Sequence, residues 1–231
     1  MSYYTLVPAL PTLAPLARLQ ELPCSTLKLE QRLSMLSEAD REQLARALHL
    51  CQRERVGDEA LSDADEIALW HSELEAISDP TLCAVIAEYL QSRTLVAALR
   101  YRLAGQQDGG SFKGFGPCVW LIQRDWQQPL FGLERRFPWL MQAREALEAG
   151  RSRALEQMLL ERFWTRLWRI EQEQVFSFAA VAAYRLRWAL AEYRLRWSGE
   201  QAQEYFDRWV GSTLQSLDPG QSEREWAGSE A

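Results

Sequence analysis

The sequence predicts an all-α protein, a multi-helix bundle with a central helix that is apolar on two faces. The first observation is the stretch from Phe178 to Trp197, where the pentapeptide YRLRW occurs twice, nine residues apart. At about 100° per residue, this spacing turns the two copies to opposite sides of one helix. The second observation is a series of helix start signals along the chain. The third is the 47% hydrophobic content of 231 residues, which suffices for a sizeable core.

The predicted central helix carries two apolar stripes with i, i+4, i+7 spacing. One stripe contains Tyr184, Trp188, Ala191 and Leu195, and the other contains Leu186, Leu190, Tyr193 and Trp197. Arginines border both stripes, and Glu192 precedes Arg196 by four residues, which predicts an ion pair between them. A helix that is apolar on two faces needs neighbours on both. We therefore expect an interior helix with both Trp188 and Trp197 covered.

The opening segment contains Pro8, Pro11 and Pro15, which disfavour one continuous helix. It predicts a strand or a packed extended arm.

Four helices are expected next, each from a start signal. They begin at Ser25 (to about 35), at Ser37 with Asp40 three residues later (to about 55), at Ser62 (to 77), and at Asp79-Pro80, with Gly105 ending the fourth.

Residues 105–117 contain five glycines, which invites comparison with a phosphate-binding loop. The comparison fails, because Lys113 precedes Gly114 and the preceding element is helical. The composition predicts a flexible surface connector. We therefore expect an N-terminal helical half over 1–104, this connector, a C-terminal helical half over 118–216, and a disordered tail over 217–231.

The C-terminal half should contain five helices, with the central helix the fourth of them. They are predicted over 119–125, over 133–147 with an interruption near Pro138, over 151–174, over the central stretch capped by Ser177, and over 200–214.

The charge is uneven along the chain. Net charge is −6, with fifteen acidic and seven basic residues in 1–90, but two acidic and five basic residues in 91–130. The acidic total argues against a general nucleic-acid binder, so we expect no nucleic-acid partner.

The cysteines and histidines give no sign of a metal site. The four cysteines form no CxxC pair, and His49 and His71 are not four residues apart. Neither a signal peptide nor an apolar run of about 18 residues is apparent, which predicts a cytoplasmic protein with reduced thiols. No nucleophile with its base and no carboxylate pair stands out. We expect no enzymatic activity, cofactor or metal.

The helix from Asp79 to Gly105 contains an unusual pair of cations. Arg93 and Arg100 interrupt an otherwise apolar stripe, and a charge buried alone costs several kcal/mol. Two interpretations stay open: ion pairs to neighbouring helices with snorkelling stems, or a docking site for another protein of a complex.

Several segments resemble a bacterial family encoded within V-type (V/A-type) ATP synthase operons and usually labelled a domain of unknown function. They are YYTLVPALPTL, PCSTLKLEQRLSMLSEAD, SRTLVAALRYRLAG and FWTRLWRIEQEQVFSFAAVAAYRLRWAL. The matching positions are Tyr3, Tyr4, Leu6, Val7, Leu10, Pro11, Leu36, Ser37, Asp40, Arg93, Ala97, Ala98, Arg100, Trp164, Leu167 and Phe176. The similarity spans most of residues 1–210.

This resemblance implies a non-catalytic component of a rotary V-type ATPase, in the place of the all-helical adaptor that links the central shaft to the membrane rotor ring. Contact with the membrane would then occur through the complex only. Position on the helix and likeness to the family give Arg93, Arg100, Arg102, Tyr3 and Tyr4 as candidate partner-binding residues. The alternative is an all-helical cytosolic chaperone for assembly of a redox enzyme or membrane complex, which would bind a peptide in an aromatic groove.

Overall fold

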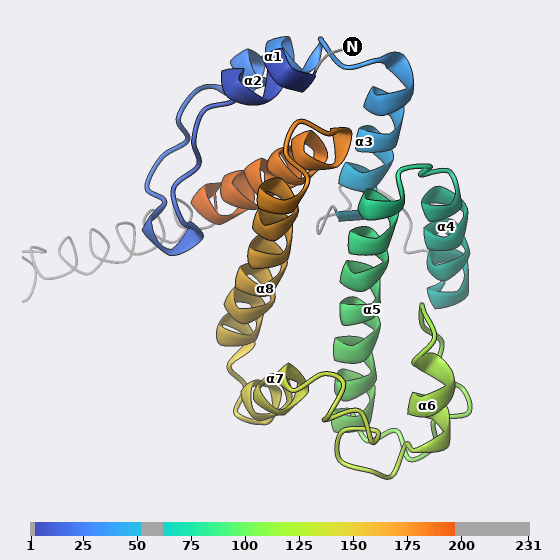
Figure 1. Ribbon diagram of the computed structural model, residues 1–231. Helices are drawn as coiled ribbons and strands as arrows, with labels where there is room; N and C mark the ends of the chain where they lie inside the picture. The colour runs from blue at the N-terminus through green and yellow to red at the C-terminus, as the bar shows by residue number, and fades with distance from the viewer. Residues whose placement is uncertain (1–2, 52–61, 197–231) are drawn as a thin grey trace, which may run out of the picture.

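The computed structural model describes residues 3–51 and 62–196, and every regular element within them is a helix (Figure 1). The elements are α1 (Tyr3–Ala9), a 3-10 turn (Leu16–Arg18), α2 (Thr26–Leu33), α3 (Glu38–Cys51), α4 (Asp63–Glu75), α5 (Pro80–Leu103), α6 (Val119–Arg124), α7 (Trp139–Glu148), α8 (Ser152–Glu173) and a helix over residues 178–196. The predicted all-α bundle is confirmed. The helix expected over 200–214 and the tail lie outside the described residues.

The start signals are satisfied by side-chain caps, which supply acceptors for the free N–H groups of a first helical turn. Ser37 Oγ accepts from the Asp40 N–H at 3.1 Å and Ser62 Oγ from the Asp65 N–H at 3.2 Å. Asp79 Oδ1 accepts from the Leu82 N–H at 2.8 Å, and Pro80 occupies the first turn of α5. The sequence therefore placed the beginnings of α3, α4 and α5 correctly.

The opening segment differs from the expected strand or extended arm. Tyr3–Ala9 is a helix that contains Pro8, and the chain becomes irregular after it. A proline so close to the end of a helix removes only one hydrogen bond. Leu6 is buried and anchors the short helix to the core.

The buried side chains form two clusters, and α5 contributes to both. The first cluster combines α1 to α4, the beginning of α5, the end of α8 and the 178–196 helix. The second combines Leu95 to Leu99 of α5 with α6, α7 and Leu155 of α8. Figure 1 shows α5 running from the end near α3 and α4 to the end near α6 and α7. The core is thus divided along the length of one helix.

The 178–196 helix is buried on both predicted stripes. Trp188 is fully buried, and Leu186 and Leu190 on the opposite side are also buried. Trp197 lies outside the described residues. Glu192 does not form the expected pair with Arg196: it accepts from the Thr26 hydroxyl and lies 3.8 Å from Arg185 Nη1. Neighbouring elements therefore determine the charge pairing along this helix.

α5 has the length and apolar composition that a membrane span requires, with 56% of its most apolar stretch buried inside the protein. The expectation that the chain has no apolar run of about 18 residues was therefore wrong for this helix, although every 18-residue stretch of it contains both Glu88 and Arg93. Its apolar residues are not confined to one stripe, since Leu90 and Leu95 are buried too.

The glycine-rich segment is packed against the protein, contrary to the flexible connector predicted. Phe112 and Phe115 are buried, and the Phe115 N–H donates to Thr94 Oγ1 of α5 at 2.9 Å. A Cβ on Gly114 would lie 2.4 Å from Thr94 Cγ2, so only glycine allows this approach. Glycine here provides contact with α5. The division of the chain at this segment stays a prediction.

Candidate functional site

A cleft of about 550 Å³ lies beside α5. Its walls come from α4, α5, the beginning of α8, residues 112–114 and Tyr193 of the 178–196 helix. Binding sites for small molecules or peptide side chains usually have volumes of about 300–1,000 Å³. The lining is both aromatic and charged, and it includes two of the predicted candidates, Arg93 and Arg100.

Arg93 is held inside the cleft by two contacts with α4. Its guanidinium carbon lies 4.7 Å from the ring centre of Trp70, and Nη2 lies 3.4 Å from Glu66 Oε1. Stacking and ion pairing together fix a side chain that is only half-buried. For Arg93, the first of the two interpretations, an ion pair to a neighbouring helix, is confirmed.

Arg100 differs from Arg93. It is exposed at the cleft, and the described residues offer it no hydrogen-bond acceptor or ion-pair partner. Lys113 is likewise exposed at the cleft and has no acceptor in the same ranges. Its backbone position follows from the contact of Gly114 with Thr94. The packed loop thus places a second cation without an acceptor in the described residues at the cleft, besides Arg100.

Two acidic side chains of the cleft accept hydrogen bonds from tyrosines. Tyr101 donates to Asp63 Oδ2 at 2.5 Å, and Tyr193 donates to Glu156 Oε1 at 2.6 Å. The bond to Asp63 raises the pKa of Tyr101, because the carboxylate stabilises the protonated phenol. Tyr101 also packs edge-on against Phe112, with ring centres 5.8 Å apart. The acidic groups of the cleft are therefore engaged within the protein.

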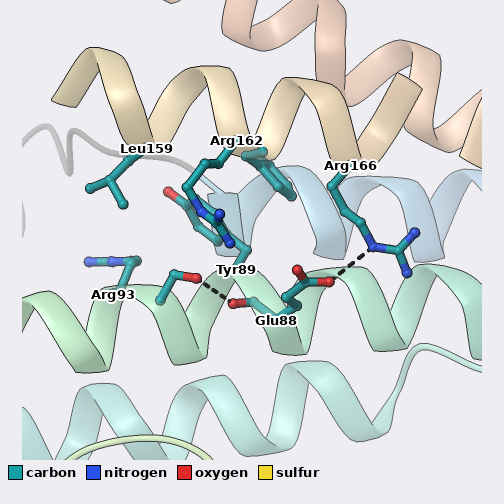
Figure 2. A pocket seen from close by; sticks show the side chains of 8 residues that line it. Glu88, Tyr89, Arg93, Leu159, Arg162 and Arg166 are labelled. Atoms are coloured by element: carbon teal, nitrogen blue, oxygen red, sulfur yellow. Dashed lines mark hydrogen bonds and ion pairs between the residues drawn. The ribbon is translucent and has the colours of Figure 1, made fainter. Parts of the chain in front are cut away.

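A second, smaller hollow of about 50 Å³ lies between α5 and α8 (Figure 2). It shares Tyr89, Arg93 and Leu159 with the cleft. Figure 2 shows Arg166 paired with Glu88, and the distance from Nε to Oε2 is 3.0 Å.

Arg162 also lines this hollow. Its guanidinium carbon lies 5.0 Å from the ring centre of Trp139. Partial burial lowers the pKa of Arg162, and Glu88 partly offsets this effect. The small hollow is thus a crowded junction between α5 and α8, with room for little more than one water-sized group.

Arg102 faces away from the cleft. Its Nη1 donates to the backbone carbonyl of Trp126 at 3.3 Å and to that of Gln128, and its guanidinium carbon lies 5.3 Å from the ring centre of Phe131. Burial, followed by the charge of Arg144, lowers the pKa of Arg102. This arginine connects α5 to the loop after α6.

Tyr3 and Tyr4 lie on α1, near the opposite end of the molecule from α6 and α7 (Figure 1). Tyr3 donates to Asp40 Oδ2 at 2.6 Å, and burial followed by this bond raises its pKa. Tyr4 is 70% exposed, and its ring centre lies 4.7 Å from that of Phe176. Phe176 has a φ of 61°, which is rare for a bulky residue. Neither tyrosine lines the cleft.

The structure therefore brings Arg93 and Arg100 together and leaves Arg102, Tyr3 and Tyr4 elsewhere. Sequence reasoning missed Lys113, Trp70 and Tyr101 as cleft residues. Lys113 belongs to the basic stretch 91–130, which was the available signal for it.

Within the described ranges, no group of three or more His, Cys, Asp and Glu side chains is placed to hold a metal ion. Comparisons of the chain with models of protein families, with curated proteins and with solved structures found no match in any of the three.

Proposed function

We propose that this protein is a non-catalytic adaptor that docks a partner protein in the cleft beside α5. The observation that carries the proposal is Arg100, an exposed cation at the edge of a cleft of about 550 Å³ with no acceptor in the described part of the chain. Arginine and aromatic side chains are enriched where proteins bind one another. The cleft offers both kinds.

In this proposal, the adaptor is a component of a rotary V-type ATPase or ATP synthase. The resemblance of residues 1–210 to the operon-encoded family supports this assignment. The chain occupies the position between the central shaft and the rotor ring, on the cytoplasmic face of the membrane, while other proteins of the complex perform the ATP chemistry. A stiff helical body suits the transmission of torque.

The alternative function, an assembly chaperone, is favoured by the aromatic side chains of the same cleft. Trp70, Tyr101 and Phe112 all line it; Tyr101 is 39% exposed, whereas Trp70 and Phe112 are buried beneath the surface. A leader peptide with apolar residues would bind to such a wall. The two functions differ in their partners, which are folded shaft and ring proteins in one case and an isolated peptide in the other.

Affinity purification of the tagged full chain from its source cells in mild detergent separates the two functions. The adaptor should retain shaft and rotor-ring proteins at stoichiometric amounts, whereas the chaperone should retain a precursor with its leader. Recovery of the precursor without ATPase components contradicts the adaptor proposal.

Two charge-reversal variants test the site. Arg100→Glu should reduce the recovered ATPase components, and Lys113→Glu should do the same, because both cations are exposed at the cleft without an acceptor in the described residues. Arg169→Glu is the matched control, because Arg169 is exposed on α8 outside the cleft. Circular dichroism should show that all three remain folded. If both cleft variants stay folded and retain the ATPase components, the cleft is not the docking site.

A further inference from the structure

We infer that the cleft binds an acidic segment of the partner, with carboxylates at Arg100 and Lys113 and an aromatic or aliphatic residue against the exposed ring of Tyr101. This inference rests on the proposed docking function only in that the cleft receives another protein. It adds the chemistry of the segment that enters.

The charged side chains of the cleft that lack a partner in the described residues are both cations. Asp63, Glu66 and Glu156 each accept from a donor of the protein itself, namely Tyr101, Arg93 and Tyr193. Arg100 and Lys113 remain as cations without an acceptor in residues 3–51 and 62–196. Guanidinium binds a carboxylate in a planar, two-bond arrangement. The charged groups of the cleft that remain unpaired in the described residues are therefore hydrogen-bond donors.

The same region belongs to the basic middle of a chain whose acidic excess lies in residues 1–90 and 197–231. Residues 91–130 carry five basic and two acidic residues, although the net charge of the protein is −6. Residues 1–90 carry fifteen acidic and seven basic residues, so an acidic segment is disfavoured by that stretch and favoured near Arg100 and Lys113, the cations left unpaired in the described residues. Complementary charge of this kind determines where and in which direction a partner binds.

The apolar part of the occupant follows from the aromatic pair. Tyr101 is 39% exposed, and Phe112 packs against its ring at 5.8 Å. The hydrogen bond to Asp63 fixes the Tyr101 hydroxyl and leaves its ring as an apolar surface. A side chain adjacent to the carboxylates would bury this surface.

The first experiment identifies the segment. A benzophenone amino acid replaces Ser152, which lines the cleft, in the full chain in its source cells, and replaces Gln157 of α8 as the control outside the cleft. Mass spectrometry then sequences the peptide that becomes cross-linked. We expect an acidic segment with an aromatic or aliphatic residue at position 152 and none of that peptide at position 157.

The second experiment tests recognition by charge. A synthetic, fluorescein-labelled copy of the cross-linked peptide is titrated with the full chain and followed by anisotropy. Replacement of both Arg100 and Lys113 by glutamate should weaken binding at least about tenfold. Lysines in place of the peptide's acidic residues should restore binding to that variant and weaken binding to the original chain. Arg169→Glu should change neither affinity.

Several outcomes overturn the inference. These are no cross-link at position 152, a cross-link to a basic or uncharged segment, a cross-link to residues 52–61 or 197–231 of this chain or to a second copy, and an affinity that is unchanged by the double reversal. Failure of the proposed function is distinguishable. If the cross-linked segment is acidic but comes from a protein outside the rotary ATPase, the inference holds and the ATPase assignment is wrong. If it is basic and comes from a shaft or ring protein, the ATPase assignment holds and the inference is wrong.

Discussion

The ion pair between Arg187 and Glu171 provides a quantitative test of the core. Arg187 is 5% exposed, its Nη1 lies 2.7 Å from Glu171 Oε2, and its guanidinium carbon lies 4.2 Å from the ring centre of Trp164. Arg187 Nε and Glu171 Oε1 are buried without a partner in the described part of the chain. Each charged side chain is therefore removed from water but lacks part of its hydrogen bonding. Its burial is compensated mainly by the charge of the other side chain.

The two single variants should be much less stable than the double variant. Removing one partner of a buried pair costs about 3–5 kcal/mol, whereas replacing both by apolar residues of similar volume is often neutral or stabilising. We expect Glu171→Leu to lower the free energy of unfolding at pH 7 by about 3 kcal/mol, and Arg187→Met by a similar amount. The double variant should lose less than about 1 kcal/mol, because methionine still packs on Trp164 and no buried ion remains.

Urea unfolding followed by circular dichroism measures all four proteins, and equal m-values make the free energies comparable. The exposed pair of Arg166 and Glu88 is the matched control, because the contact is similar at 3.0 Å but the side chains are 36% and 47% exposed. Its coupling energy should not exceed about 1 kcal/mol. The reasoning fails if the buried pair shows no greater coupling than the exposed pair.

Three further predictions concern the packed loop and the titration of Glu171. Thr94→Val should lower the free energy of unfolding by about 1–3 kcal/mol in urea, because the buried Phe115 N–H loses its acceptor, whereas Thr94→Ser should retain most of the stability. Gly114→Ala should cost about 1–3 kcal/mol in the same assay, because its Cβ would lie 2.4 Å from Thr94 Cγ2; a variant as stable as the original chain would contradict this packing. Burial raises the pKa of Glu171 above its ordinary 4.5, so the folded protein favours the neutral form. The free energy of unfolding of the wild type relative to Glu171→Gln should therefore be greatest below pH 4.5 and fall as pH rises through the pKa of the folded protein. Urea unfolding from pH 4 to 8 measures this difference. An increase with pH would show that burial does not raise the pKa of Glu171.

The beginnings of α3, α4 and α5 could be predicted because their causes are local. Ser37, Ser62 and Asp79 form caps with N–H groups three residues away. The apolar stripes of the 178–196 helix are also a local pattern, and Trp188 is buried as expected. These features could be predicted because all the residues that form them are close together in the sequence.

The candidate site was predicted only in part, because its geometry depends on segments distant in sequence. Arg93 and Arg100 were recognised as unusual, but nothing local shows that only Arg93 reaches Glu66. Arg102 lies on the same helix, yet its acceptors are backbone carbonyls after α6.

The packing of residues 105–117 against α5 was not predicted, for a different reason. A flexible linker and a loop in close backbone contact share the same composition. The steric requirement at Gly114 arises from Thr94 of α5, twenty residues earlier in the chain.

The participation of α5 in both buried clusters has a mechanical consequence. Its 24 residues extend about 36 Å, with proline only at the first turn and no glycine in its interior. Kinks in helices usually require such residues. Relative movement of the two clusters would have to bend this continuous helix, so a displacement imposed at the α6 and α7 end is carried to α3 and α4 without a hinge between them.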